Sequence, residues 1–345
     1  MTDRVSPDEL PSALEPIVRE RIPGARKAKI VNWKRTERGF STETYLFELD
    51  GAEHTSAGYV FRRPPEVALF PDYDLRRQYL VTDRLTPTGL AVPRVRWIED
   101  GDTALGTPYY VMDRIADAEA PSDFPSYHTA GSYFDADERG RAKMWWGCME
   151  TMAQIHRLDH DRLRLGFLAM PEFGEQPVEQ AVNYLDWAVH WASPSLPPVM
   201  ERALTWLREN LYEPEHVTLC WGDARMSNIL YARDHTVAGV LDWEMAYLGD
   251  HEADLAWLLF LDWACSDFEG HPRLPGTPNR EETIARYEEL TGRPVRNLRF
   301  NEVLAAVLLS VPLLRLSTHL QVGEHADISA FCIRRLEDLL GGAQP

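Results

Sequence analysis

The chain has 345 residues, of which 44% are hydrophobic and 11 are tryptophan, so it can bury a large core and is not a disordered polymer. Its length allows two domains or two lobes. A formal net charge of −18 argues against general nucleic-acid binding, because that affinity comes largely from Lys and Arg on phosphates. An acidic surface could attract a cationic substrate, although salt screens exposed charges beyond about 8–10 Å.

Cysteine usage and hydropathy indicate a reducing compartment. Four cysteines are scattered among apolar neighbours without a CxxC pair, which predicts buried free thiols: Cys148, Cys220, Cys265 and Cys332. The N-terminal stretch MTDRVSPDEL lacks the apolar core of a signal peptide. The longest apolar run, residues 303–316, is interrupted by Pro312 and Arg315 and is too short to span a bilayer. We therefore expect a cytoplasmic protein without a membrane partner.

The first 113 residues are predicted to be mostly strands. They open with a helix at residues 11–21, in which Leu14, Ile17 and Val18 share one face. A turn at residues 35–41 is expected to join two strands. The strands are predicted at residues 29–33, 44–48, 58–63, 94–99 and 108–112, and a second helix at residues 75–85.

Residues 114–345 are predicted to be mostly helical. The Pro-, Ser-, Asp- and aromatic-rich segment 121–133 is a candidate for a long connection or a flexible flap. The first long helix carries a stripe at spacings of three and four that we interpret as core: Ala142, Trp145, Met149, Met152 and His156. Helices are expected at residues 136–158, 184–191, 198–211, 253–263, 281–291, 301–320 and 328–340. Strands followed by helices give a two-lobe α+β layout.

The chain is organised around residues 221–254, which read WGDARMSNILYARDHTVAGVLDWEMAYLGDHEAD. Asp223 follows a short apolar run, so we expect it where a strand gives way to a loop, with Asn228 at the far end of that loop. Residues 236–241 alternate branched and small residues, as a returning strand would. Pairing the two strands would bring Asp223, Asn228 and Asp242 to one end of a hairpin.

Magnesium explains why such oxygens would be gathered. Mg²⁺ is bound by one or two side-chain oxygens plus substrate phosphates, and Asn228 and Asp242 suit that role. Asp223 would then accept a proton from a substrate hydroxyl, and Arg225 could reach the phosphate as a permanent cation. Taken singly, any of these residues could merely occupy a turn, but the ordered set favours a site.

The stretch resembles the catalytic and metal-binding loops of the aminoglycoside phosphotransferase family, which are small-molecule kinases with a fold like that of protein kinases. Its part VLDWEMAYLGDHEADLAWLL is similar to the branch related to the kinase-like domains found with acyl-CoA dehydrogenases. The resemblance implies that Asp223 is the catalytic base and that Asn228 and Asp242 bind the metal. It also implies that Asp254 braces the catalytic loop.

By the same resemblance, the chain is expected to have a bilobal, protein-kinase-like α+β fold. Residues 1–113 would form the N-lobe that covers the nucleotide, and residues 114–345 the helical C-lobe with the catalytic and metal loops and the acceptor site. ATP or GTP with Mg²⁺ is expected to enter between the lobes, and a hydroxyl-bearing small molecule would approach Asp223. The acceptor stays open among aminoglycosides, macrolides, other amino sugars, choline-like alcohols and hydroxyacyl-CoA thioesters.

Two segments of the N-lobe are candidates for phosphate binding. Gly39, Ser41 and Thr42 lie in a loop between two strands that could offer backbone N–H groups and hydroxyls, and the family has a similar loop at this place. Arg62 ends the strand GYVFRR and aligns with the phosphate-binding lysine of protein kinases, where an arginine would make a bidentate contact. The alternative interpretation of Arg62 is a solvated strand end.

The predicted helix at residues 75–85 should carry an acidic partner for that cation. The family pattern has a glutamate where this chain has Gln78, which can hydrogen-bond a guanidinium but supplies no charge. Either Asp74 or Asp83 compensates, or the pairing is weaker in this chain.

The stretch PYYVMDRI looks like the last N-lobe strand and the hinge. Backbone groups of Met112, Asp113 and Arg114 would then meet the adenine. Within the central motif, Trp221 stands where the family has a histidine that packs against the catalytic loop. Tryptophan can fill space and donate one hydrogen bond but cannot accept one.

Two functions therefore stand. In the first the protein is an active phosphotransferase, and in the second it is a catalytically silent relative that binds nucleotide or ligand. The presence of Asp223, Asn228 and Asp242 together favours the enzyme, since a silent relative has no need of all three.

Overall fold

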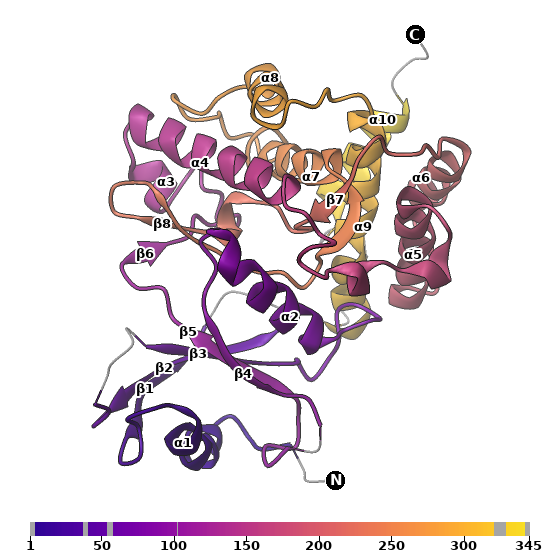
Figure 1. Cartoon of the computed structure of the whole chain (residues 1–345). Helices are drawn as coiled ribbons and strands as arrows, with labels where there is room; N and C mark the ends of the chain where they lie inside the picture. Colours follow the sequence, from indigo (N-terminus) through magenta and orange to yellow (C-terminus); the bar gives the residue numbers. More distant parts are fainter. Residues whose placement is uncertain (1–3, 37–40, 54–57, 102, 321–328, 342–345) are drawn as a thin grey trace. The chain divides into compact units, whose positions relative to one another are not determined.

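The computed structural model describes residues 4–36, 41–53, 58–101, 103–320 and 329–341. The chain forms two compact units (Figure 1). The N-terminal unit comprises Met1–Ala68 and Asp72–Ala118, and the C-terminal unit comprises Leu69–Pro71 and Glu119–Pro345. The sequence-based division is placed after residue 113.

The N-terminal unit contains a five-stranded antiparallel sheet. Its strands are β1 (Lys29–Arg35), β2 (Glu43–Asp50), β3 (Tyr59–Arg63), β4 (Val95–Glu99) and β5 (Tyr109–Asp113). They lie in the order β1-β2-β3-β5-β4, so β5 inserts between β3 and β4. All five overlap the predicted strands.

Two helices cover opposite faces of this sheet, α1 (Leu10–Arg21) and α2 (Leu75–Leu85) (Figure 1). Successive residues of a strand point to opposite faces, so Phe61 packs in the core under α1 while its neighbour Val60 packs with α2. Val18, on the predicted apolar face of α1, is fully buried. A short 3-10 turn, Thr86–Thr88, follows α2.

The C-terminal unit is mainly helical. Its α-helices are α3 (Ser132–Asp135), α4 (Glu138–His156), α5 (Pro177–Ala192), α6 (Pro198–Glu209), α7 (Glu252–Trp263), α8 (Arg280–Thr291), α9 (Leu298–Leu320) and α10 (Ala330–Gly341). Short 3-10 turns occur at Gly166–Leu168, Pro171–Phe173 and Met226–Asn228, and a π-helical turn, Ala264–Phe268, continues α7. Side chains from α5, α6, α7, α9 and α10 form one hydrophobic core. The stripe predicted on α4 is confirmed as core for Trp145, Met149, Met152 and His156, which are buried, whereas Ala142 is half-buried.

Helix α9 continues through Pro312, so that residue does not interrupt the apolar segment as the sequence suggested. Among the described residues, Leu298–Thr318 is the one segment whose length and composition would suffice to cross a membrane, and 67% of its apolar window is buried inside the protein. Its neighbours in the core are α5, α6, α7 and α10. Burial against these helices compensates for the hydrogen bond that a proline removes from a helix.

Short strands of the C-terminal unit position the central motif. They are β7 (Val217–Cys220), β8 (Ile229–Ala232), β9 (Val237–Val240) and β10 (Tyr247–Asp250), and β6 (Ala118–Glu119) spans the division between the units. The predicted pairing of the strands before Asp223 and Asp242 is wrong, because β7 pairs with β10 and β9 pairs with β8. The stretch after Asn228 forms a local hairpin in which β9 pairs with β8.

The segment predicted as a long connection or flexible flap, residues 121–133, is packed. Ser126 and Tyr127 are almost fully buried, and their hydroxyls donate hydrogen bonds to the Cys265 carbonyl and to Asp262. The prediction of buried free cysteines is confirmed at all four positions, Cys148, Cys220, Cys265 and Cys332.

Candidate active site

The central motif begins with a sharp turn after β7. Gly222 has a φ of 86°, and a Cβ at this position would lie 2.1 Å from the carbonyl oxygen of Met245. Only glycine fits both the backbone angle and the close approach. Asp223 therefore follows directly from a strand end into the loop, as predicted.

Asp254, in the first turn of α7, braces this turn. One carboxylate oxygen accepts the backbone N–H of Trp221 at 2.7 Å, and the other accepts that of Gly222 at 2.8 Å. His156 Nε2 contacts Asp254 at 2.8 Å, and burial lowers the pKa of His156 although Asp254 opposes that shift. These contacts confirm the bracing role that the resemblance implies for Asp254.

Asp223 is only 4% exposed, and three donors orient its carboxylate. Oδ1 accepts the indole N–H of Trp257 at 2.9 Å, and Oδ2 accepts Asn228 Nδ2 at 2.7 Å. Oδ2 also contacts Arg225 Nη2 at 2.9 Å. A carboxylate that is buried, oriented and still able to accept further hydrogen bonds has the properties of a general base.

The charges around Asp223 set its protonation. Burial raises the pKa of this carboxyl above its usual value of 3.8, while the positive charge of Arg225 lowers it. The negative charge of Asp242 raises it again, and the hydrogen bond from Asn228 opposes that effect. The net shift is upward, because burial and neighbouring carboxylates outweigh one guanidinium.

Arg225 bridges two carboxylates. Its Nη2 contacts Asp223, and its Nη1 donates to Asp123 Oδ2 at 3.0 Å. The pKa of Arg225 is raised against the opposing effect of burial, because the neighbouring carboxylates stabilise its charge. In this structure Arg225 serves as a counter-ion within the loop, whereas the sequence predicts a cation that reaches a phosphate.

The two predicted metal ligands lie at the open end of the β8–β9 hairpin. The backbone N–H of Leu241 donates to the Asn228 carbonyl at 2.9 Å, which brings Asn228 next to Asp242. Asn228 Nδ2 is bound to Asp223, so its amide oxygen is the atom that remains for a metal. An amide oxygen and the half-buried carboxylate of Asp242 fit a hard cation such as Mg²⁺.

Trp221 occupies the place where the family has histidine, and it is fully buried. Its indole N–H lies 2.8 Å from the carbonyl oxygen of Leu241 and 3.1 Å from that of Asp242. It also packs against Trp243, with ring centroids 5.8 Å apart. Trp221 thus links the loop that carries Asp223 to the loop that carries Asp242 by donating a hydrogen bond, which a tryptophan can do.

Two predicted phosphate-binding residues, Thr42 and Arg62, lie in one hydrogen-bonded group of the N-terminal unit together with Gln78. The Thr42 hydroxyl contacts the hydroxyl of Tyr73, which accepts Gln78 Nε2 at 3.2 Å. Arg62 Nη1 donates to the Tyr110 hydroxyl at 3.3 Å, and that hydroxyl lies 3.5 Å from Gln78 Oε1. Gln78 therefore meets Arg62 through Tyr110.

Gly39, Ser41 and Asp74 were also predicted to take part in phosphate binding or in holding Arg62. Gly39 lies outside the described residues, and Ser41 is half-buried beside Thr42. The Asp74 carboxylate caps α2 and pairs with Arg76.

The predicted hinge groups are partly used within the sheet. The backbone N–H of Asp113 donates to the Arg94 carbonyl at 2.8 Å, and that of Arg114 to the Gly58 carbonyl at 3.0 Å. These two amides are therefore committed to hydrogen bonds within their unit. The Asp113 side chain is held by Arg96 at 2.7 and 2.8 Å.

The sequence analysis missed several residues that surround Asp223 or Arg62. Asp123 was hidden in the connection 121–133, and Tyr73 and Tyr110 carry no motif. Trp257 lies in the predicted helix at residues 253–263 and is not among the predicted site residues. The signal that could have identified it is spacing, because Trp257 lies three residues after Asp254 and so shares its helix face.

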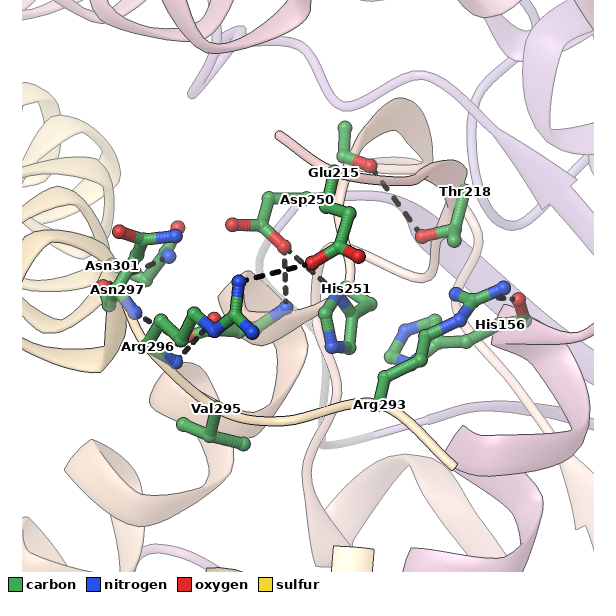
Figure 2. Close-up of polar contacts among 12 residues, drawn as sticks. His156, Glu215, Thr218, Asp250, His251, Arg293, Val295, Arg296, Asn297 and Asn301 are labelled. Carbon is green, nitrogen blue, oxygen red and sulfur yellow. Dashed lines mark hydrogen bonds and ion pairs between the residues drawn. The ribbon is translucent and has the colours of Figure 1, made fainter. Parts of the chain in front are cut away.

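A second group of acidic and imidazole side chains lies at the start of α7. Among the described residues, Asp250, His251 and Glu252 are close enough together to hold a metal ion (Figure 2). The two Glu252 oxygens, however, accept the backbone N–H groups of Arg296 and Asn297 at 2.7 Å each, just before α9 begins. We assign this group to anchoring the α9 N-terminus, whose exposed amides and dipole favour a carboxylate.

An open groove of about 500 Å³ lies beside α8, lined by residues such as Trp146, Thr277 and Arg286. None of the predicted site residues lines it. We therefore place no part of the candidate active site there.

Comparison with known proteins finds similarity over much of this chain. The model of a phosphotransferase enzyme family matches residues 32–290. Acyl-CoA dehydrogenase family member 10 of Mus musculus is 26% identical over 72% of this chain and 22% of its own length. Family member 11 of Homo sapiens is 26% identical over 66% of this chain and 29% of its own length. The chain thus spans less than a third of these two relatives.

Solved structures share the fold. A candidate aminoglycoside phosphotransferase from Ralstonia eutropha JMP134 superimposes with a TM-score of 0.71 at 18% identity, covering 95% of both chains. A choline kinase from Cryptosporidium parvum Iowa II gives a TM-score of 0.62 at 12% identity, covering 96% of this chain and 94% of the other. The predicted kinase-like α+β fold and the predicted resemblance are thereby confirmed. The chain belongs to the phosphotransferase enzyme family.

Proposed function

We propose that this chain is a small-molecule kinase that transfers the γ-phosphate of ATP or GTP to a hydroxyl group. The observation that carries the proposal is the carboxylate of Asp223, which Trp257, Asn228 and Arg225 orient within one buried loop. Asp223 would accept the proton of the attacking hydroxyl and hold that hydroxyl in position. A positioned base of this kind contributes on the order of 10²–10⁴ in rate.

Asn228 and Asp242 would hold Mg²⁺, each through a side-chain oxygen. When bound, Mg²⁺ would supply positive charge against the negative charge that develops on the phosphates during transfer. The contact between Asn228 Nδ2 and Asp223 supports this assignment, since it fixes which end of the amide faces a ligand.

In the N-terminal unit, Arg62 would supply positive charge to the phosphates. Gln78 and Thr42 would orient it through the hydroxyls of Tyr110 and Tyr73. Gln78, which supplies no charge, stands where the family has a glutamate, and the guanidinium of Arg62 stays charged at any working pH.

The contacts of Trp221 favour an enzyme over a silent relative. Trp221 is buried and donates to carbonyl oxygens of the metal loop, so the departure from histidine preserves the link between the two loops. We therefore keep the active phosphotransferase as the proposed function.

The variant Asp223→Asn tests the proposal. It should lower the transfer rate on the order of 10²–10⁴ while the Mg-nucleotide affinity, measured by calorimetry, stays nearly unchanged. Asp161→Asn makes the same charge change at a side chain that is 89% exposed and serves as the control. A wild-type protein that binds no Mg-nucleotide would refute the kinase.

The acceptor can be found by mass spectrometry of phosphorylated products from a library of amino alcohols, amino sugars, macrolides and hydroxyacyl thioesters. Binding of nucleotide without transfer or hydrolysis across that library would support the silent relative instead.

A further inference from the structure

Asp123 is a buried carboxylate that the family resemblance does not assign. Its side chain is 7% exposed and lies in the packed connection between the N-terminal unit and α4. Its Oδ2 accepts Ser227 Oγ at 2.6 Å and Arg225 Nη1 at 3.0 Å. Both donors belong to the short loop between the candidate base and the first candidate metal ligand.

The segment that carries Asp123 is itself held in place. The Ser126 hydroxyl donates to the Cys265 carbonyl at 2.5 Å, and the Tyr127 hydroxyl donates to Asp262 at 2.8 Å. His128 Nε2 contacts the same Asp262 oxygen at 3.1 Å. All these partners lie at the C-terminal end of α7 or in the turn that continues it, so Asp123 is a fixed point relative to that helix.

The guanidinium of Arg225 links Asp123 to Asp223. One Nη contacts Asp123 and the other contacts Asp223, so the planar group spans the two carboxylates. A guanidinium is rigid, and two partners fix its plane where one partner would let it rotate. Removing Asp123 would leave Arg225 tethered to the candidate base alone and would also release Ser227.

We propose that Asp123 is a positioning residue for phosphotransfer, which acts through Arg225 to hold the Asp223 carboxylate in its reactive orientation. The catalytic part of this inference rests on the proposed function. The contrasting possibility is that Asp123 only stabilises the fold, in which case its loss would lower stability and leave turnover per folded molecule intact.

A double-mutant cycle separates the two possibilities. Asp123→Asn, Arg225→Met and the double variant would be compared in the hydrolysis of Mg-ATP without an acceptor. We expect Asp123→Asn to lower kcat by about 10–100-fold, as for other supporting-shell residues, with the KM for Mg-ATP changed less than about twofold. Because Asp123 acts through Arg225, the double variant should be no slower than Arg225→Met alone.

Asp135→Asn is the matched control, since Asp135 is an exposed carboxylate close by in the sequence. Losses that multiply in the double variant would overturn the proposal, because they would show that Asp123 acts independently of Arg225. A normal kcat in Asp123→Asn would overturn it as well.

An NMR measurement tests the same link without depending on turnover. The indole N–H of Trp257 donates to Asp223, so its ¹⁵N–¹H resonance, assigned with Trp257→Phe, reports the place of that carboxylate. Asp123→Asn should shift this resonance and leave that of Trp145, which donates to Thr283 elsewhere in the unit, unmoved. An unmoved Trp257 resonance would overturn the link whatever the activity. A shifted resonance in a protein that neither hydrolyses Mg-ATP nor transfers phosphate across the acceptor library would support the link and refute the proposed function.

Discussion

Trp257 shows how one residue can belong both to the core and to the site. Its ring is 2% exposed and packs in the hydrophobic core of the C-terminal unit, while its indole N–H donates to Asp223 Oδ1. Tryptophan suits such a position because it combines a large apolar body with one polar donor. The candidate base is therefore anchored to the hydrophobic core of its unit.

The variant Trp257→Phe should move the pH dependence of the reaction. It removes a donor that favours the ionised form of Asp223, whose pKa burial already raises above 3.8. The pKa should therefore rise further, and because the base must be ionised, activity should be lost at a higher pH on the acid side. The measurement is kcat/KM for Mg-ATP hydrolysis against pH, with Trp206→Phe on α6 as the control. An acid limb that stays in place would contradict the role of Trp257.

At the scale of elements, α7 connects the parts of the site. Asp254 holds the turn before the base, Trp257 holds the base itself, and Asp262 holds the connection that carries Asp123. These three residues are spaced by three and five positions along one helix, so a single rigid element sets their mutual placement. Errors in the position of α7 would therefore disturb all three together.

The variant Asp254→Asn should destabilise the C-terminal unit. Asparagine has one acceptor oxygen, so one of the two buried amides, of Trp221 or Gly222, would lose its partner. Leaving a buried polar group unsatisfied costs about 1–3 kcal/mol. Chemical denaturation should show this loss, and Asp267→Asn, at an exposed position in the turn after α7, should not. Equal stability of the two variants would argue against the bracing role.

The sequence predicted the positions of helices and strands better than it predicted which strands pair. The strands of the N-terminal unit and helix α2 were found because alternation and helical periodicity depend on neighbouring residues. The partner of β7 was wrong, since β8 and β9 have only four residues each and no pattern in them reveals which strand each one joins.

The sequence predicted those residues of the candidate site that lie within the motif at residues 221–254. Asp223, Asn228 and Asp242 lie within 20 residues of sequence, and the structure brings them together. Asp123 lies 102 positions before Arg225, and no local pattern marks that contact. Residues that support a site across such separations become visible only in the folded chain.

At the scale of the whole molecule, each unit has its own core and its own set of candidate ligand-binding residues. Arg62 belongs to the N-terminal unit, whereas Asn228 and Asp242 belong to the C-terminal unit. If one Mg-nucleotide uses both sets, a change in either unit should weaken the same binding event.

Thermal unfolding with and without Mg-ATP tests this requirement. At 100 times its dissociation constant, a ligand stabilises the native state by about 2.7 kcal/mol, so Mg-ATP should raise the Tm of the wild type. Arg62→Met and Asp242→Asn should each reduce that increase, and EDTA should remove the magnesium-dependent part. Arg26→Met changes an exposed arginine of the N-terminal unit and should leave the increase intact. A full increase in either site variant would show that its unit is not needed.

The four buried cysteines make the opening of one unit chemically visible. All of them belong to the C-terminal unit, and burial raises the pKa of Cys148 and of Cys332 to about 12, so little reactive thiolate exists at neutral pH. A thiol reagent should therefore label the native protein only as fast as this unit opens, with no signal from the N-terminal unit. If Mg-ATP binds the folded unit, it should make opening rarer and lower the labelling rate, which mass spectrometry can follow cysteine by cysteine.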